Sequence, residues 1–85
     1  MNLQDTVEMM NSSDYKERFK AEFYQLKLRI DGLDVMLTKY ENGTLEFTPS
    51  CDIALLETQI ATMVAYENIL KMRAKQEGIE LPSFT

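Results

Sequence analysis

An apolar periodicity of three and four residues runs through one long stretch of this chain and constrains its fold more than any other feature. The positions that follow it are Tyr15, Phe19, Phe23, Leu26, Ile30, Leu33, Leu37 and Tyr40. Side chains at this spacing share one face of an α-helix, which turns about every 3.6 residues. The spacing predicts a long helix over residues 14–42, in which Asp14 and Glu17 form a capping box and Asn42-Gly43 ends the helix.

A second periodic stretch follows after a short gap. Its apolar positions are Ile53, Leu56, Ile60, Met63, Leu70 and Ala74. They predict a second long helix over residues 52–77, capped by Ser50 or Cys51 and stopped by Gly78. Residues 43–51 are expected to form an ordered loop, because this segment is short, has no partner strand and contains Pro49.

The first thirteen residues predict a short amphipathic helix and a linker. Leu3, Val7 and Met10 are spaced by four and three residues, and the helix-breaking residues 11–13 follow them. Adding a tail at residues 78–85 gives a single all-α domain over residues 1–85. The expected architecture is a short N-terminal helix followed by a long antiparallel two-helix hairpin.

A second set of apolar residues lies off the two main stripes and suggests self-association. Its members are Tyr24, Leu28, Val35, Met36, Leu55, Tyr66, Ile69 and Met72. Two helices cannot cover so many apolar faces, and contiguous exposed apolar surface is rare on monomers. We therefore expect a homo-oligomer. In the alternative interpretation, the leading helix and a loop containing Leu45 and Phe47 cover the surplus within one chain.

Composition excludes several classes of function. The 85 residues include no histidine and one cysteine, Cys51, which removes the usual catalytic dyads, an internal disulfide and histidine-containing zinc sites. We expect no catalytic residues, no metal, no cofactor and no enzymatic activity. No apolar run approaches the roughly 18 residues that span a membrane, and no signal peptide is evident. A net charge of −5 disfavours long nucleic acid as a partner.

Charge is sorted along the predicted hairpin. Residues 14–29 and 70–77, which meet at its open end, contain eight basic and four acidic residues, whereas residues 30–69 contain one base and seven acids. Basic groups beside tyrosines suit a small phosphate-bearing ligand. The candidate ligand-binding residues are Tyr15, Lys16, Arg18, Lys20, Arg73 and Lys75. Alternatively, these charges form a solvated face with pairs such as Glu67 with Lys71 and Arg73 with Glu77.

Two segments carry a resemblance to known proteins. The sequences YKERFKAEFYQLKLRI (residues 15–30) and LLETQIATMVAYENILKMRAKQEGIEL (residues 55–81) resemble small phage-encoded proteins of the crAss-like phage family. The helical architecture is similar to that of phage anti-CBASS and anti-Thoeris nucleotide sponges. This resemblance implies a closed oligomer, such as a hexamer, that sequesters a cyclic nucleotide or an ADP-ribose-type signal without cleaving it.

The first hypothesis from the sequence is therefore a phage counter-defence protein in the cytoplasm of the infected bacterial host. It would capture a small nucleotide second messenger, within one hairpin or in pockets between subunits. A second hypothesis is an acidic inhibitor that binds a host defence protein through the acidic segment from Asp31 to Glu57. A third is a structural adaptor.

Overall fold

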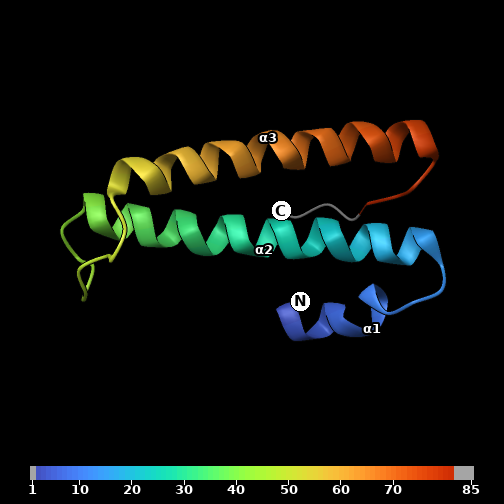
Figure 1. Ribbon diagram of the computed structural model, residues 1–85, viewed down its shortest axis with the longest axis horizontal. Coiled ribbons are helices and arrows are strands. Elements are labelled where there is room, and N and C mark those ends of the chain that lie inside the picture. The colour runs from blue at the N-terminus through green and yellow to red at the C-terminus, as the bar shows by residue number, and fades with distance from the viewer. Residues whose placement is uncertain (1, 82–85) are drawn as a thin grey trace.

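A computed structural model describes residues 2–81, and all regular structure within that range is helical (Figure 1). A 3₁₀ helix η1 (Leu3–Thr6) continues into α1 (Val7–Met10), and the long helices α2 (Tyr15–Glu41) and α3 (Ile53–Glu77) follow. The predicted order of one short helical segment and two long helices is confirmed. The loop between the long helices forms turns and bends without a strand, as expected.

The two long helices lie side by side, and α3 returns along α2 in the opposite direction (Figure 1). Tyr15 at the start of α2 therefore meets Glu77 at the end of α3, where the phenol donates a hydrogen bond of 2.8 Å to the carboxylate. The Cα trace is 43 Å long and 24 by 23 Å across. We call the end that holds Tyr15 and Glu77 the open end, and the other the loop end.

The start of α2 differs in detail from the predicted capping box. Asp14 caps the helix, but its Oδ1 accepts a hydrogen bond of 3.0 Å from the backbone N–H of Lys16 and not from that of Glu17, as a capping box requires. The Asp14 N–H donates to Ser12 Oγ at 3.0 Å, which replaces the return bond expected from Glu17. A complete capping box lies instead at η1, between Asn2 and Asp5.

Helix α3 begins after Asp52, so the prediction that Ser50 or Cys51 caps it is wrong. Asp52 has an extended backbone with ψ of 133°, and helical geometry starts only at Ile53. The predicted stop is confirmed, because Gly78 adopts a left-handed φ of 70°. Beyond it, the Ile79 N–H donates to the Ala74 carbonyl at 2.9 Å, and this turn sends Ile79 back into the core.

The core lies between the long helices near the open end. From the predicted stripe of α2 it contains Phe19, Phe23, Leu26 and Ile30, and from the other side Leu70, Ala74 and Ile79. Both ends of the stripe, Tyr15 and Tyr40, are exposed. Leu37 is also buried.

The predicted apolar face of the leading helix is wrong. Leu3, Val7 and Met10 are all exposed, whereas Thr6 is fully buried and Met9 packs against the core. The first residues form a 3₁₀ helix, which has about three residues per turn. A period of 3.6 residues therefore assigns the buried face of this segment to the wrong residues. The Thr6 hydroxyl donates to the Leu3 carbonyl at 2.7 Å and accepts from Gln25 Nε2 at 2.9 Å, which anchors this segment to α2.

Candidate functional site at the open end

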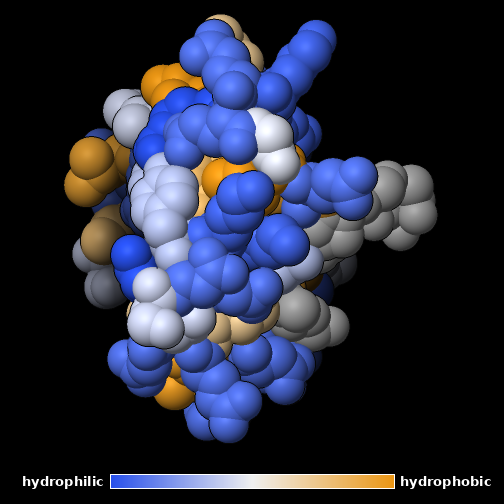
Figure 2. All heavy atoms as spheres, turned by 90° about the vertical axis from the view of Figure 1, so that its right-hand side faces the viewer, coloured by the Kyte–Doolittle hydropathy of each residue, from blue (hydrophilic) through white to orange (hydrophobic). Residues whose placement is uncertain are grey.

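The open end is dominated by hydrophilic side chains with small apolar areas between them (Figure 2). The sequence groups Arg73 with Lys75 there, but residues two apart on a helix point about 200° away from each other. The structure accordingly places Arg73 with Tyr15 on one side of α3 and Lys75 with Lys71 on the other. The predicted basic cluster is therefore two separate groups.

The first group is a network of Tyr15, Arg73 and Glu77. Arg73 Nη2 donates to the Tyr15 hydroxyl at 2.7 Å, and Arg73 Nε lies 3.2 Å from Glu77 Oε2. The guanidinium also stands over the Phe19 ring, 5.1 Å from its centroid. The expected alternative pair of Arg73 with Glu77 is thus confirmed, and its carboxylate neutralises the guanidinium.

Hydrogen bonding within this network changes both pKa values. The bond to the Glu77 carboxylate raises the pKa of Tyr15 from its ordinary value of 10.0, with burial and the negative charge of Glu77 as further causes and Arg73 acting against them. The pKa of Arg73 is also raised, chiefly by its hydrogen bond to Glu77. Both groups are thereby held in their ordinary protonation states.

Arg18 lies outside this network. Its Nη1 donates to the Ser12 carbonyl at 2.8 Å, which ties the turn before α2 to the first turn of that helix. Part of its donor capacity is therefore used within the chain.

The second group surrounds a hollow of about 310 Å³, which we call the lysine pocket. Its lining consists of Phe23, Lys71, Ala74, Lys75, Ile79 and Leu81. The left-handed turn at Gly78 makes this hollow possible, because it folds Ile79 back against α2 and α3. The result is a mostly apolar hollow whose lining includes two lysine side chains.

Two further candidate lysines belong to the same side. Lys16, Lys20 and Phe23 are spaced by four and three residues, so they share one face of α2. Within residues 2–81 neither Lys16, Lys20 nor Lys75 makes an ion pair. These three lysines therefore have no carboxylate within ion-pair distance in the described part of the chain.

A buried carboxylate, Glu67, pairs with Lys71 of the pocket lining. Glu67 Oε1 is 3.5 Å from Lys71 Nζ, which confirms the alternative pair expected from the sequence. Glu67 Oε2 is 4.0 Å from Lys27 Nζ, and Lys27 also lies 3.3 Å from Asp31. Glu67 thus connects α3 to α2 and offsets part of the positive charge of Lys71.

A second hollow, of about 450 Å³, lies between α2 and α3 further from the open end. Its lining consists of Glu22, Gln25, Leu26, Arg29, Leu33, Gln59, Met63 and Tyr66. One acid and one base give it no net charge. It is therefore less suited to a phosphate than the lysine pocket.

Of the residues that line the lysine pocket, only Lys75 is among the ligand-binding residues predicted from sequence. The apolar pattern predicts Phe23 and Ala74 as core residues, and Ile79 and Leu81 fall in the predicted tail. Lys71 contributes to the charge pattern but is not a predicted ligand-binding residue. A usable signal was present, because Lys71 and Lys75 are four residues apart and Arg73 lies between them on the opposite side.

None of the helices within the described range is both long and apolar enough to cross a membrane. Among those residues, no three cysteine or acidic side chains gather into a group that could hold a metal ion.

Comparison with known proteins gives one match. Neither a curated protein nor a solved structure matches the chain. A family model described as Sequestin matches residues 13–76, about three quarters of the 85 residues. The match starts just before α2 and reaches almost to the end of α3, so it includes the lysines of both helices. The family name suggests sequestering a molecule, which is binding rather than catalysis. Because this match covers about three quarters of its residues, the chain belongs to the Sequestin family.

Proposed function

We propose that this protein binds and sequesters a small nucleotide signal of the cyclic nucleotide or ADP-ribose type. The observation that carries the proposal is the lysine pocket, a mostly apolar hollow whose lining includes Lys71 and Lys75. Phosphates would bind the ammonium groups, and a base or ribose would lie over the apolar lining.

The charges favour a small ligand over a long one. Lys16 and Lys20 extend the positive side beyond the pocket, and lysine provides mobile point charges that attract phosphate. The loop end has the opposite sign, because residues 30–69 contain one base and seven acids. A long nucleic acid would meet that acidic end, whereas a compact nucleotide would contact only the open end.

Capture without conversion fits both the family and the chemistry. The family name suggests sequestering, and a protein that holds its ligand acts through its amount and not through turnover. A protein of this kind lowers the free concentration of a signal in the cell that makes it. We propose that it acts as a phage counter-defence protein in the cytoplasm of an infected bacterium.

The test is a panel of cyclic dinucleotides, cyclic trinucleotides and ADP-ribose isomers, measured by thermal shift and calorimetry. A ligand that binds only the folded protein must raise its unfolding temperature. We expect at least one member of the panel to do so and to be recovered chemically unchanged. If none binds, the proposal is wrong, and direct inhibition of a host protein becomes the better hypothesis.

Matched variants locate the site. Lys75→Gln should weaken nucleotide binding about tenfold, equivalent to about 1.4 kcal/mol, because it removes a charge beside the phosphate. Lys39→Gln removes the same charge from the loop end and should leave affinity unchanged. Arg73→Gln tests the Tyr15 network, and a loss there with no loss in Lys75→Gln would move the site to that side of α3.

A further inference from the structure

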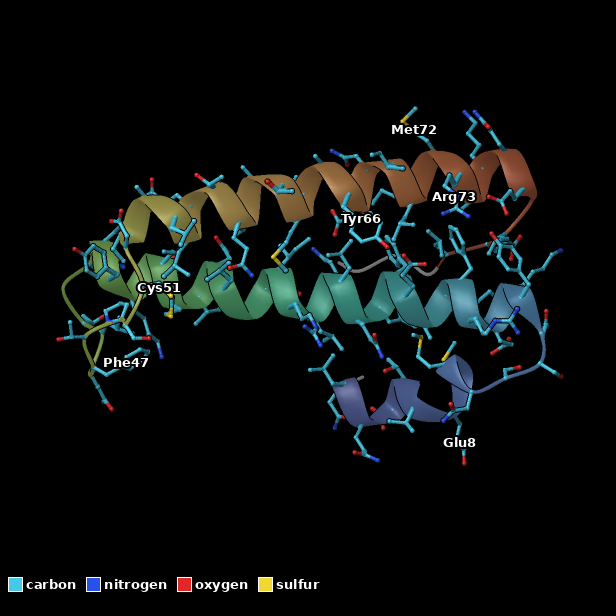
Figure 3. The ribbon with its side chains drawn as sticks, viewed as in Figure 1. Glu8, Phe47, Cys51, Tyr66, Met72 and Arg73 are labelled. Atoms are coloured by element: carbon cyan, nitrogen blue, oxygen red, sulfur yellow. The ribbon has the colours of Figure 1, made fainter. Side chains whose placement is uncertain are left out.

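Helix α3 has an outer face without charge. We use this name for Ala54, Leu55, Thr58, Ala61, Thr62, Ala65, Ile69 and Met72, whose spacing places them on the side of α3 away from the buried residues Leu70 and Ala74. Met72 points away from α2 in Figure 3. No charged residue lies among them over five turns of helix, which is unusual for a face open to solvent.

The large side chains of this face are the most exposed apolar groups of α3. Leu55 is 60%, Ile69 53% and Met72 63% exposed. Residues 2–81 cover other parts of the second apolar set, since Tyr24 is buried, but nothing in that range covers these three. The leading segment therefore packs on α2, and the outer face of α3 remains exposed.

The middle of the outer face is flat enough for another helix. A shallow hollow runs along Ala54, Thr58, Ala61, Thr62 and Ala65, with Glu57 at its edge. Small side chains let two helix backbones approach closely, and larger residues at both ends can then pack over them. Leu55 lies at one end of this hollow, and Ile69 and Met72 lie beyond the other.

Charge selects both the occupant and its direction. The first half of α3 has Glu57 beside the outer face, whereas its second half has Lys71 and Lys75 on that same flank and Arg73 on the other. If a second copy packs antiparallel, Glu57 of each chain meets the basic half of the other. If it packs parallel, Glu57 of each chain lies opposite the uncharged flank at Leu55 of the other and gains no basic partner, while Lys71 and Lys75 lie opposite Arg73, which Glu77 already pairs.

We propose that the outer face of α3 packs against the same face of a second copy, with the two α3 helices antiparallel. The arrangement is isologous, so one two-fold axis passes near the middle of the face, close to Met63. Ala54 of one chain then lies opposite Met72 of the other. Only in this antiparallel arrangement do the charges beside the outer face of one copy attract those of the other.

The first experiment is light scattering of the full chain at micromolar concentration. We expect twice the 9.9 kDa mass of one chain, or an even multiple of it. Ala65→Glu places two carboxylates near the two-fold axis and should halve the mass, while circular dichroism shows an unchanged helix content. Gln59→Glu is the matched control, because it adds the same charge on the flank of α3 toward α2 and should remain assembled.

A monodisperse monomer would overturn the proposal and assign the outer face to a different protein. Full assembly of Ala65→Glu would also overturn it. A defined oligomer with an odd number of subunits would contradict the two-fold arrangement.

Disulfide trapping tests the direction. In a Cys51→Ser background, chains with Ala54→Cys and chains with Met72→Cys are oxidised separately and as a mixture. The antiparallel arrangement predicts a cross-linked species only in the mixture, because facing helical positions lie within disulfide range and the ends of one face do not meet themselves. Cross-linking within each single variant would show parallel packing and would contradict the proposal.

Discussion

Among residues 2–81, Glu67 is the charged residue that is buried. Its side chain is only 10% exposed, and Oε2 has no hydrogen bond within the described part of the chain. Its ion pairs are long, at 3.5 and 4.0 Å, and Lys27 retains Asp31 as another partner. Desolvation of this carboxylate therefore offsets much of the attraction that it gains.

We predict that Glu67→Leu keeps or raises the free energy of unfolding, by up to about 2 kcal/mol, because it removes a desolvated charge and fills the same space. Urea denaturation measures this change. The control is Leu70→Ala on the same helix, which empties a fully buried site and should lower stability by about 2–5 kcal/mol. A loss of more than about 2 kcal/mol in Glu67→Leu would show that its ion pairs outweigh desolvation.

The raised pKa of Tyr15 makes the free energy of unfolding depend on pH in the alkaline range. Its pKa is raised in the folded protein, chiefly by the hydrogen bond to Glu77, so the folded state keeps the proton more tightly than the unfolded state does. This contribution is complete below the ordinary value of 10.0 and is lost as pH rises through the folded pKa. Burial raises the pKa of Tyr24 in the same direction.

We therefore expect the unfolding midpoint to fall as pH rises above 10.0. Tyr15→Phe should make that fall shallower, and adding Tyr24→Phe should flatten it further. Phenolate absorbance, followed in the same samples, reports the titration directly. An equally steep fall in the double variant would mean that other groups cause the alkaline sensitivity.

At the scale of the helices, two glycines have opposite roles. Gly32 lies inside α2, and a Cβ added there would meet nothing within 4 Å. Gly78 ends α3 at a φ of 70°, a conformation that side chains with a Cβ adopt at a cost. Both positions are open in space, so backbone conformation alone separates them.

We predict that Gly32→Ala raises the free energy of unfolding by about 0.5–1 kcal/mol, and that Gly78→Ala lowers it by about 1–2 kcal/mol. Thermal denaturation followed by circular dichroism would measure both changes. The prediction requires that the two variants change the free energy of unfolding in opposite directions. Stabilisation by Gly78→Ala would show that the turn relaxes without its left-handed residue.

At the scale of the whole molecule, charge separates the open end from the loop end. Asp34→Asn and Glu41→Gln together change the net charge from −5 to −3 without touching the lysine pocket. Asp31 is left in place, because Lys27 joins it to Glu67, the partner of Lys71. We predict that nucleotide binding stays within a few-fold, because screening reduces interactions beyond a Debye length of about 8 Å at physiological salt. Calorimetry at that ionic strength measures the affinity. Loss of nucleotide binding would place the ligand at the loop end.

The sequence alone could predict part of the candidate site. It predicted that basic residues and Tyr15 gather at one end, because helix lengths and loop position fix which residues meet there. It paired Arg73 with Glu77 and Glu67 with Lys71 as one alternative, and these pairs form because each joins residues four apart on one helix. It did not separate Lys75 from Arg73, although helical geometry alone requires that separation.

What the sequence determined by itself is local. The two long helices, the cap at Asp14 and the stop at Gly78 depend on residues within about one turn of each other, so pattern is enough to find them. The tertiary structure decided which face of the leading segment is buried, how α2 and α3 are rotated against each other, and that Ile79 returns to form a pocket with Phe23 and Lys75. Those outcomes depend on packing between residues outside one helical turn of each other, 19 positions apart for Thr6 and Gln25 and 56 for Phe23 and Ile79. There, burial of Thr6 and Ile79 outweighs the apolar pattern nearby.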